Sequence, residues 1–251
     1  MDVLVCIKRV PMVGERIPLT ADGREIDTEF LGFTISPHEE CAVEEAVRIT
    51  ERRGGTVTVL TLGPGGAADQ LRYALSLGAH RAILLETDGR EWGPIATADA
   101  IAEAVRQRGP FDLVLFGSES ADSGGYQVGV RVAHQLSLPV VTGAKALEIG
   151  EADAWVRREY RGAGEIFELP LPAVITVKEG INMPRYPSLP GRLRAKKAPI
   201  DRWQPAWREE GLRTRALQVP STGQRGAEVL GTGEEAIPKL VGLLESLGIL
   251  A

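Results

Sequence analysis

The chain has 251 residues, of which 43% are hydrophobic and 25% charged, and its formal net charge at pH 7 is −5. This composition excludes a disordered chain, and the acidic balance lacks the basic excess that binding to a nucleic-acid backbone requires. No apolar run approaches the ~20 residues that cross a bilayer, and Cys6 and Cys41 lack zinc or redox spacing. We therefore expect a globular cytoplasmic protein with two buried thiols, no nucleic-acid partner and no membrane insertion.

Short β-branched runs alternate with longer helical patterns in the first half of the chain. The predicted strands, apolar enough to be buried on both faces, are 3–7, 56–62, 82–86 and 112–116. The predicted helices are 37–53, 67–77 and 95–107. This alternation predicts a doubly wound, mainly parallel α/β sheet with helices on both faces, of the Rossmann-like type that binds adenine nucleotides.

The pattern changes after Pro139. Short runs at 145–149, 155–159, 165–169 and 173–177 predict added antiparallel strands. Residues 181–224 are rich in proline and arginine and predict an extended arm rather than a core layer, and the segment around Leu189 is too proline-rich to join a sheet or helix. A final helix follows, with Thr232 and Glu235 as a capping box or with a start nearer Pro238, and Gly248 ends it. We divide the chain into a nucleotide-binding domain, 1–180, and a partner-binding arm with the C-terminal helix, 181–251.

The segment most informative about function is the loop 117–129, which follows the fourth predicted strand and opens a helix running to about residue 136. Its candidate ligand-binding residues are Gly117, Asp122, Ser123, Gly124, Gly125, Tyr126, Gln127, Val128 and Gly129. Small residues let backbone N–H groups approach an anion at the positive end of a helix. The loop therefore predicts a nucleotide phosphate site. The alternative is a loop that only caps its helix, through Asp122 or Ser123.

Other motifs are weaker. The loop 63–68 loosely matches G-x-G-x-x-A, but it follows the second strand, whereas the turn after the first strand has a single glycine. Around His38, Ser36 as N-cap, Pro37 at the first helical position and Glu39 three residues after the cap form a helix start signal rather than a metal or acid–base site. We predict no catalytic acid, base or nucleophile.

A family resemblance rests on the C-terminal half. Pro-Ala-Val-Ile-Thr at 172–176, Asn-Met-Pro-Arg-Tyr-Pro-Ser-Leu-Pro at 182–190 and Ala-Lys-Lys at 195–197 closely resemble the β subunit of electron-transfer flavoproteins. The similarity continues upstream through Glu165, the loop with Asp122, and segments 42–47 and 5–10. It covers most of the chain up to about residue 200.

The resemblance implies a heterodimer with the electron-transfer flavoprotein α subunit, which holds most of the redox FAD, while the β subunit helps to enclose the flavin and binds AMP. The pair accepts electrons from acyl-CoA or other flavin dehydrogenases and delivers them to the electron-transfer flavoprotein quinone oxidoreductase. Beside the loop 117–129, the AMP site would include Cys6, Ser36, Pro37, His38, Glu39 and Leu62. Dehydrogenases would bind at Pro184, Arg185, Tyr186, Leu189 and Pro190, with Leu189 as the anchor.

Departures from the family leave alternatives open. AMP-binding members typically read Asn-x-Thr-Gly where this chain has Tyr-Gln-Val-Gly at 126–129, a sequence more like electron-bifurcating members with a second FAD in this place. Outside the family, a free-standing adenine-nucleotide-binding module of the universal-stress type would end near residue 140 and lack the arm. A nucleotide-dependent ligase or transferase would need a pyrophosphate loop and a catalytic Lys or His, neither of which the sequence indicates.

Overall fold

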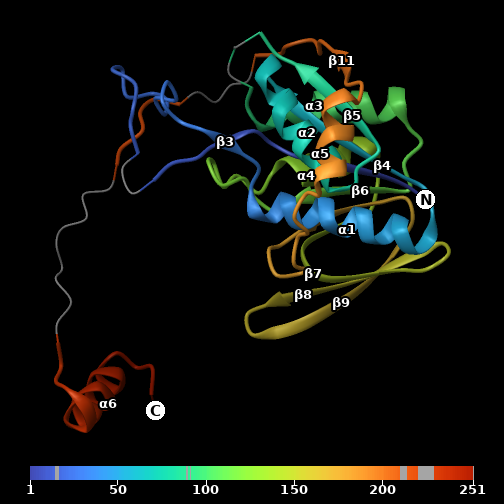
Figure 1. The fold of residues 1–251 in the computed structure, drawn as a ribbon. Helices are drawn as coiled ribbons and strands as arrows, with labels where there is room; N and C mark the ends of the chain where they lie inside the picture. The colour runs from blue at the N-terminus through green and yellow to red at the C-terminus, as the bar shows by residue number, and fades with distance from the viewer. Residues whose placement is uncertain (15–16, 89, 91, 210–213, 220–228, 251) are drawn as a thin grey trace.

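The computed structural model describes residues 1–14, 17–88, 90, 92–209, 214–219 and 229–250. Its main sheet has nine strands in the order β11-β5-β4-β1-β6-β10-β7-β8-β9 (Figure 1). These strands are β1 (Asp2–Cys6), β4 (Thr56–Gly63), β5 (Arg81–Glu86), β6 (Leu113–Gly117), β7 (Val140–Ile149), β8 (Asp153–Tyr160), β9 (Ala163–Pro170), β10 (Ala173–Val177) and β11 (Asp201–Trp203). A separate antiparallel pair joins β2 (Val10–Pro11) to β3 (Phe33–Thr34).

The helices alternate with the parallel strands as the sequence predicts. They are α1 (Pro37–Arg53), α2 (Ala68–Leu77), which follows the 3-10 turn η1 (Gly65–Ala67), α3 (Pro94–Arg108), α4 (Val128–Leu136), α5 (Leu189–Lys197) and α6 (Ala236–Ser246), which follows the 3-10 turn η2 (Gly233–Glu235). All four predicted strands of the first half and all three predicted helices are confirmed to within one or two residues.

Two apolar layers enclose the central strand β1. Val3 and Val5 pack in one core cluster with α1 and α2, whereas Leu4 and Cys6 pack in a second cluster with α3 and α4. Successive strand residues point to opposite faces, so β1 is buried on both sides. The predicted α/β fold class is confirmed, and so is the burial of Cys6 and Cys41.

The prediction of an antiparallel strand at 173–177 is wrong. β10 lies between β6 and β7 and pairs with both in parallel. The meander β7–β8–β9, which is antiparallel as predicted, extends beyond the parallel region, and the chain then returns to the interior of the sheet. All five residues of β10 are buried, which agrees with its unbroken run of apolar and β-branched side chains.

The prediction that the arm joins neither helix nor sheet is also wrong over part of its length. α5 packs against α2, and β11 pairs in parallel with β5. Ser188 caps α5 by accepting a hydrogen bond from the N–H of Gly191, and Pro190 lies in the first turn, where a helix tolerates proline. The domain boundary near residue 180 stays a prediction, and residues 210–213 and 220–224 of the arm lie outside the described residues.

The C-terminal helix α6 stands apart from the α/β body in Figure 1, and none of its residues is buried. The predicted capping box is not formed, because Thr232 makes no side-chain hydrogen bond to the helix start and η2 precedes α6. Among the described residues, no helix has the length and apolar character needed to cross a membrane.

Candidate functional site

A cavity of about 460 Å³ lies where β1, β4 and β6 end, at the carboxyl edge of the sheet. Open α/β sheets bind ligands at this edge. One part of the lining is the loop after β6 with the start of α4, and another part is the segment before α3 with its first turns. The volume falls within the range of about 300–1,000 Å³ that small-molecule sites occupy.

The structure brings many of the predicted site residues together around this cavity. The lining includes Cys6, Glu39, Leu62, Gly117, Ser123, Gly125, Tyr126, Gln127, Val128 and Gly129. The remaining predicted residues, Ser36, Pro37, His38, Asp122 and Gly124, are not part of the lining. They belong to the same two segments, the start of α1 and the loop after β6.

The start of α1 supports the cavity through two contacts. Glu39 accepts a hydrogen bond from the backbone N–H of Ser36 at 3.0 Å, and the Ser36 hydroxyl accepts one from the N–H of Ala121 at 3.0 Å. The second bond ties the loop 117–129 to α1. The helix start signal at Ser36, Pro37 and Glu39 is confirmed, since α1 begins at Pro37 with Ser36 as its N-cap.

Glu39 is a buried carboxyl group in the cavity wall, with 6% of its surface exposed. Burial raises its pKa from 4.5 to about 8, although hydrogen bonds from backbone N–H groups work in the opposite direction. The side chain is therefore largely neutral at pH 7. A neutral carboxyl group removes a charge that would otherwise repel a bound phosphate.

Lys8, which sequence reasoning missed, holds the loop from the end of β1. Its ammonium group lies 2.7 Å from a carboxylate oxygen of Asp122 and donates a 3.4 Å hydrogen bond to Ser123. Burial of Asp122 opposes its ionisation, but the charge of Lys8 and the hydrogen bonds to the carboxylate together outweigh this and lower the pKa of Asp122. Asp122 and Ser123 do not cap α4, whose N-cap is Gln127. Because Lys8 and Asp122 are 114 residues apart in the sequence, no local sequence pattern indicates their contact.

The loop requires glycine at different positions for different physical reasons. A Cβ atom at Gly117 would lie 2.8 Å from Cγ of Glu39, and one at Gly129 would lie 2.9 Å from Cγ2 of Thr176, so packing requires both glycines. Gly124 has a φ of +54°, a conformation that favours glycine. At Gly125 a Cβ atom would meet nothing within 4 Å, and neither reason applies. Gly125 is the position where the bare backbone borders open space in the cavity.

Two helix N-termini border the cavity with different donor sets. The side chain of Gln127 accepts hydrogen bonds from Arg131 rather than from the backbone at the start of α4, which leaves the first backbone N–H groups to a ligand. Gly93 caps α3, and Pro94 at its first position has no N–H to offer. An anion is therefore better served by α4 and the loop before it than by α3.

The wall on the α3 side was not predicted from the sequence. It consists of Trp92, Gly93, Pro94, Thr97 and Ile101. The rule that ligands bind at the carboxyl ends of several neighbouring strands, applied to the loop after β5, would have found this segment.

The cavity is not equipped for nucleophilic chemistry. Burial raises the pKa of the Cys6 thiol far above its usual range, and the charge of Glu39 adds to this effect. His38 lies 4.0 Å from Glu119, and burial lowers the pKa of its imidazole. The cavity provides a concave, largely apolar space with backbone N–H donors from the loop 117–129 and the start of α4.

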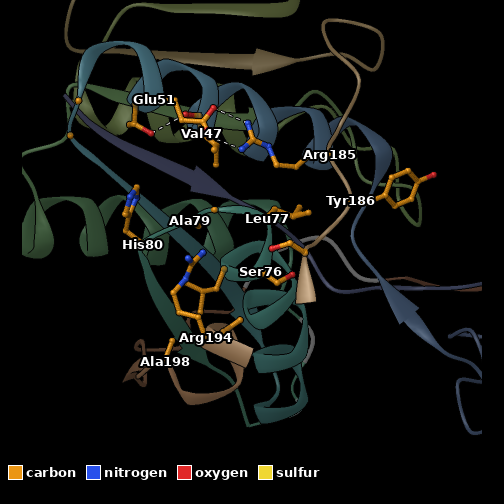
Figure 2. Close-up of a pocket in the computed structure, with 17 residues that line it drawn as sticks. Val47, Glu51, Ser76, Leu77, Ala79, His80, Arg185, Tyr186, Arg194 and Ala198 are labelled. Carbon is orange, nitrogen blue, oxygen red and sulfur yellow. Dashed lines mark hydrogen bonds and ion pairs between the residues drawn. The ribbon is translucent and has the colours of Figure 1, made fainter. Parts of the chain in front are cut away.

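The arm is fixed to α1 by polar contacts (Figure 2). Arg185 bonds to Glu44 at 2.8 Å and to Glu51 at 2.6 Å, and these hydrogen bonds raise the pKa of its guanidinium group. Arg48 donates to the carbonyl oxygen of Met183 at 3.1 Å, and Asn182 donates to that of Cys41 at 3.0 Å.

Large side chains of the arm remain exposed between these contacts. The exposed fractions are 94% for Tyr186 and 72% for Leu189, so Leu189 does not pack beneath the arm. Pro184 is half-buried and Pro190 is exposed in the first turn of α5. A second hollow, of about 710 Å³, lies beside Arg185 and Tyr186, between the ends of α1 and α2 and the helix α5 (Figure 2).

The mainly parallel sheet, with helices on both faces and a cavity at its carboxyl edge, defines a Rossmann-like class of α/β protein. Comparison with known proteins identifies the family. Residues 26–207 match the model of the electron transfer flavoprotein domain. The electron transfer flavoprotein subunit beta of Bacillus subtilis is 32% identical, with 98% of each chain covered, and that of Syntrophomonas wolfei is 34% identical, with 96% of this chain and 94% of the relative covered. The subunit beta of Mycobacterium bovis is 37% identical over 79% of this chain and 77% of the relative. The chain belongs to the electron transfer flavoprotein family, and its relatives are beta subunits.

Proposed function

We propose that this chain is the β subunit of a heterodimeric electron-transfer flavoprotein that binds AMP and, with the α subunit, encloses an FAD. The pair carries electrons from acyl-CoA or other flavin dehydrogenases to a quinone oxidoreductase. The observation that carries the proposal is the cavity at the carboxyl edge of the sheet, because its lining brings together residues from four separate segments of the predicted AMP site.

The chemistry of the cavity fits AMP. The phosphate is received by backbone N–H groups at the start of α4 and by the open backbone at Gly125, without a cationic side chain devoted to it. Lys8 keeps the loop in place through Asp122. The neutral state of Glu39 at pH 7 lowers the electrostatic cost of bringing in the phosphate charge.

The flavin supplies the redox chemistry when it is bound, and the side chains of this subunit make or break no bond. These side chains position the flavin and exclude water from it. The turn after β1 lacks the dinucleotide-binding glycine pattern, which supports an FAD held mainly by the α subunit.

The C-terminal helix supports the heterodimer. Ile237, Leu240, Val241 and Leu247 lie at helical spacing along α6, and all four are exposed. An amphipathic helix whose apolar stripe is left uncovered by the described residues of its own chain is suited to bury that stripe against a partner. We assign the stripe to the α subunit.

The arm supports docking of dehydrogenases. Its backbone is held on α1 by Arg185, Arg48 and Asn182, while Tyr186 and Leu189 project into solvent. Fixing the backbone beforehand reduces the entropy that is lost when a partner binds. Leu189 is the proposed anchor, and the other exposed side chains contribute surrounding contacts.

The test is the ligand content of the chain purified alone and with the α subunit. Alone, it should be colourless and release AMP on acid extraction, and the heterodimer should hold one FAD and one AMP. A stoichiometric flavin in the chain alone would overturn the AMP assignment in favour of the electron-bifurcating alternative, which the valine at position 128 favours because it offers no hydroxyl donor. No nucleotide of any kind in either preparation would overturn the site itself.

A further inference from the structure

Trp92 lines the same cavity as the phosphate-binding loop, which is the proposed phosphate site at residues 117–129. It precedes Gly93, the N-cap of α3, in the connection from β5. Its side chain is half-buried, packs against the core cluster of the α3–α4 layer and also lines the cavity. Neither the phosphate-binding loop nor the arm uses this residue.

The indole N–H of Trp92 is buried and has no hydrogen-bond acceptor among the residues that the structure describes. Tryptophan is a donor only, so no rearrangement of its own hydrogen can satisfy the group. Buried N–H groups are almost always paired in folded proteins, and an unpaired one is unfavourable. An acceptor atom on a bound ligand would supply the missing hydrogen-bond partner of this N–H.

The lining residues differ in chemistry in a way that favours a nucleotide. The loop 117–129 and the start of α4 offer uncapped backbone N–H groups, which suit a phosphate. Trp92, Leu62 and Ile101 contribute apolar side chains to the lining, and Pro94 removes one N–H from the start of α3. A planar aromatic group that carries acceptor atoms suits these apolar residues.

We propose that Trp92 is the base-recognising residue of the nucleotide cavity: its ring contacts the adenine and its N–H donates a hydrogen bond to an acceptor nitrogen of the base. This inference rests on the proposed function and goes further by naming the residue that distinguishes a nucleotide from a bare sugar phosphate. Sequence patterns did not single out Trp92, because its role depends on contacts between distant segments.

The experiment compares two ligands and three substitutions in the heterodimer after its nucleotide has been removed. The ligands are AMP and ribose 5-phosphate, which lacks the base. Trp92→Phe keeps an aromatic ring but removes the N–H, and Trp92→Leu removes the ring. Trp203→Phe is the matched control, because Trp203 packs against the same core cluster but does not line the cavity. Dissociation constants are measured by calorimetry.

Trp92→Phe should weaken AMP binding by about three- to tenfold, the loss expected for one hydrogen bond, and leave the affinity for ribose 5-phosphate unchanged. Trp92→Leu should weaken AMP binding further, again without effect on ribose 5-phosphate. Equal AMP affinity in the wild type, Trp92→Phe and Trp203→Phe would overturn the hydrogen bond. Equal losses for both ligands would show that Trp92 only supports the fold of the cavity and would overturn the proposal.

A fluorescence readout keeps the proposal testable if Trp92→Leu does not fold. With Trp155, Trp203 and Trp207 replaced by phenylalanine, Trp92 is the single tryptophan, and AMP should change its emission while ribose 5-phosphate should not. A protein that keeps Trp155 alone should show no change, because Trp155 lies on β8, outside the cavity lining. Unchanged Trp92 emission at saturating AMP would also overturn the proposal. Failure of the wild type to bind AMP would instead overturn the proposed nucleotide site itself.

Discussion

The cavity and the arm present two different solutions to binding. In the cavity, we propose that ligand contacts come from the backbone at strand ends, where Gly125 borders open space and the start of α4 has no side-chain cap. In the arm, side chains such as Tyr186 and Leu189 stand out from a backbone that Arg185 fixes to α1. The first arrangement suits a small enclosed ligand, and the second suits a large partner that contacts projecting side chains.

Burial of polar side chains has a different consequence in the cavity and in the arm. Around the cavity, burial changes the chemistry of polar groups, as the raised pKa of Glu39 shows. In the arm, burial serves attachment, because Glu44, with 3% of its side chain exposed, receives Arg185 and leaves the docking residues in solvent. Substitutions in the cavity should therefore change ligand and proton binding, whereas those in the arm should separate attachment from docking.

The largest expected effect concerns protons at Glu39. Because folding raises its pKa from 4.5 to about 8, the folded chain holds a proton that the unfolded chain has released between these pH values. The contribution of Glu39 to stability is fully present below about pH 4.5 and is lost as the pH rises through 8. Glu39→Gln should remove this loss, which is on the order of 5 kcal/mol.

The measurement is the free energy of unfolding of the nucleotide-free chain by denaturant between pH 5 and pH 9. The difference between Glu39→Gln and the wild type should grow with pH and level off above about 8. Glu103→Gln, at an exposed position of α3, is the control and should change stability equally at all pH values. A difference for Glu39→Gln that does not vary with pH would show that the group is ionised in the folded chain.

The second prediction tests attachment of the arm. Arg185→Ala removes one cation from the buried carboxylate of Glu44, which keeps Arg48 as its remaining ion-pair partner. Loss of one partner from a buried ion pair is strongly destabilising, and since Arg48 remains we expect about 3 kcal/mol. Denaturant unfolding measures the change, and Arg192→Ala on α5 is a control of the same charge. Equal stability of the two variants would show that the arm does not depend on Arg185.

The sequence predicted regions of local order better than regions assembled from distant segments. The limits of α1 follow from Ser36, Pro37 and the glycines after Arg53, all within one stretch of chain. The parallel placement of β10 depends on strands far away in the sequence, and so does the contact of Lys8 with Asp122. Trp92 was missed for the same reason. The sequence does not predict the start of α5, because prolines generally disfavour a helix. Pro190 lies in the first turn, where a helix tolerates it.

The third prediction returns to the cavity and has a smaller effect. A side chain at Gly125 would meet no protein atom within 4 Å and would extend into open space. Gly125→Val should leave the nucleotide-free fold intact but prevent close approach of the phosphate. The stabilisation of about 2.7 kcal/mol that a ligand gives at ~100 times its dissociation constant should then be lost.

Thermal unfolding with and without AMP measures this loss. Gly164→Val is a matched control, because Gly164 also borders open space but belongs to β9, away from the cavity. The control should keep the full shift of the melting temperature on addition of AMP. An equal AMP-dependent shift in Gly125→Val would move the phosphate away from this loop.

The last prediction concerns Leu189, where attachment and docking should separate. Its side chain is 72% exposed at the start of α5, so its truncation removes little packing within the chain. Burial of one leucine in a partner's pocket contributes roughly 1.5–3 kcal/mol, and Leu189→Ala should weaken dehydrogenase docking about ten- to hundredfold. Heterodimer stability and flavin content should not change.

Steady-state kinetics with a donor dehydrogenase measure the half-saturation concentration of the flavoprotein. Ile166→Ala is the control, since Ile166 is 73% exposed on β9, and it should leave this concentration unchanged. An unaltered half-saturation concentration for Leu189→Ala, or the same increase in both variants, would remove Leu189 from the anchor role.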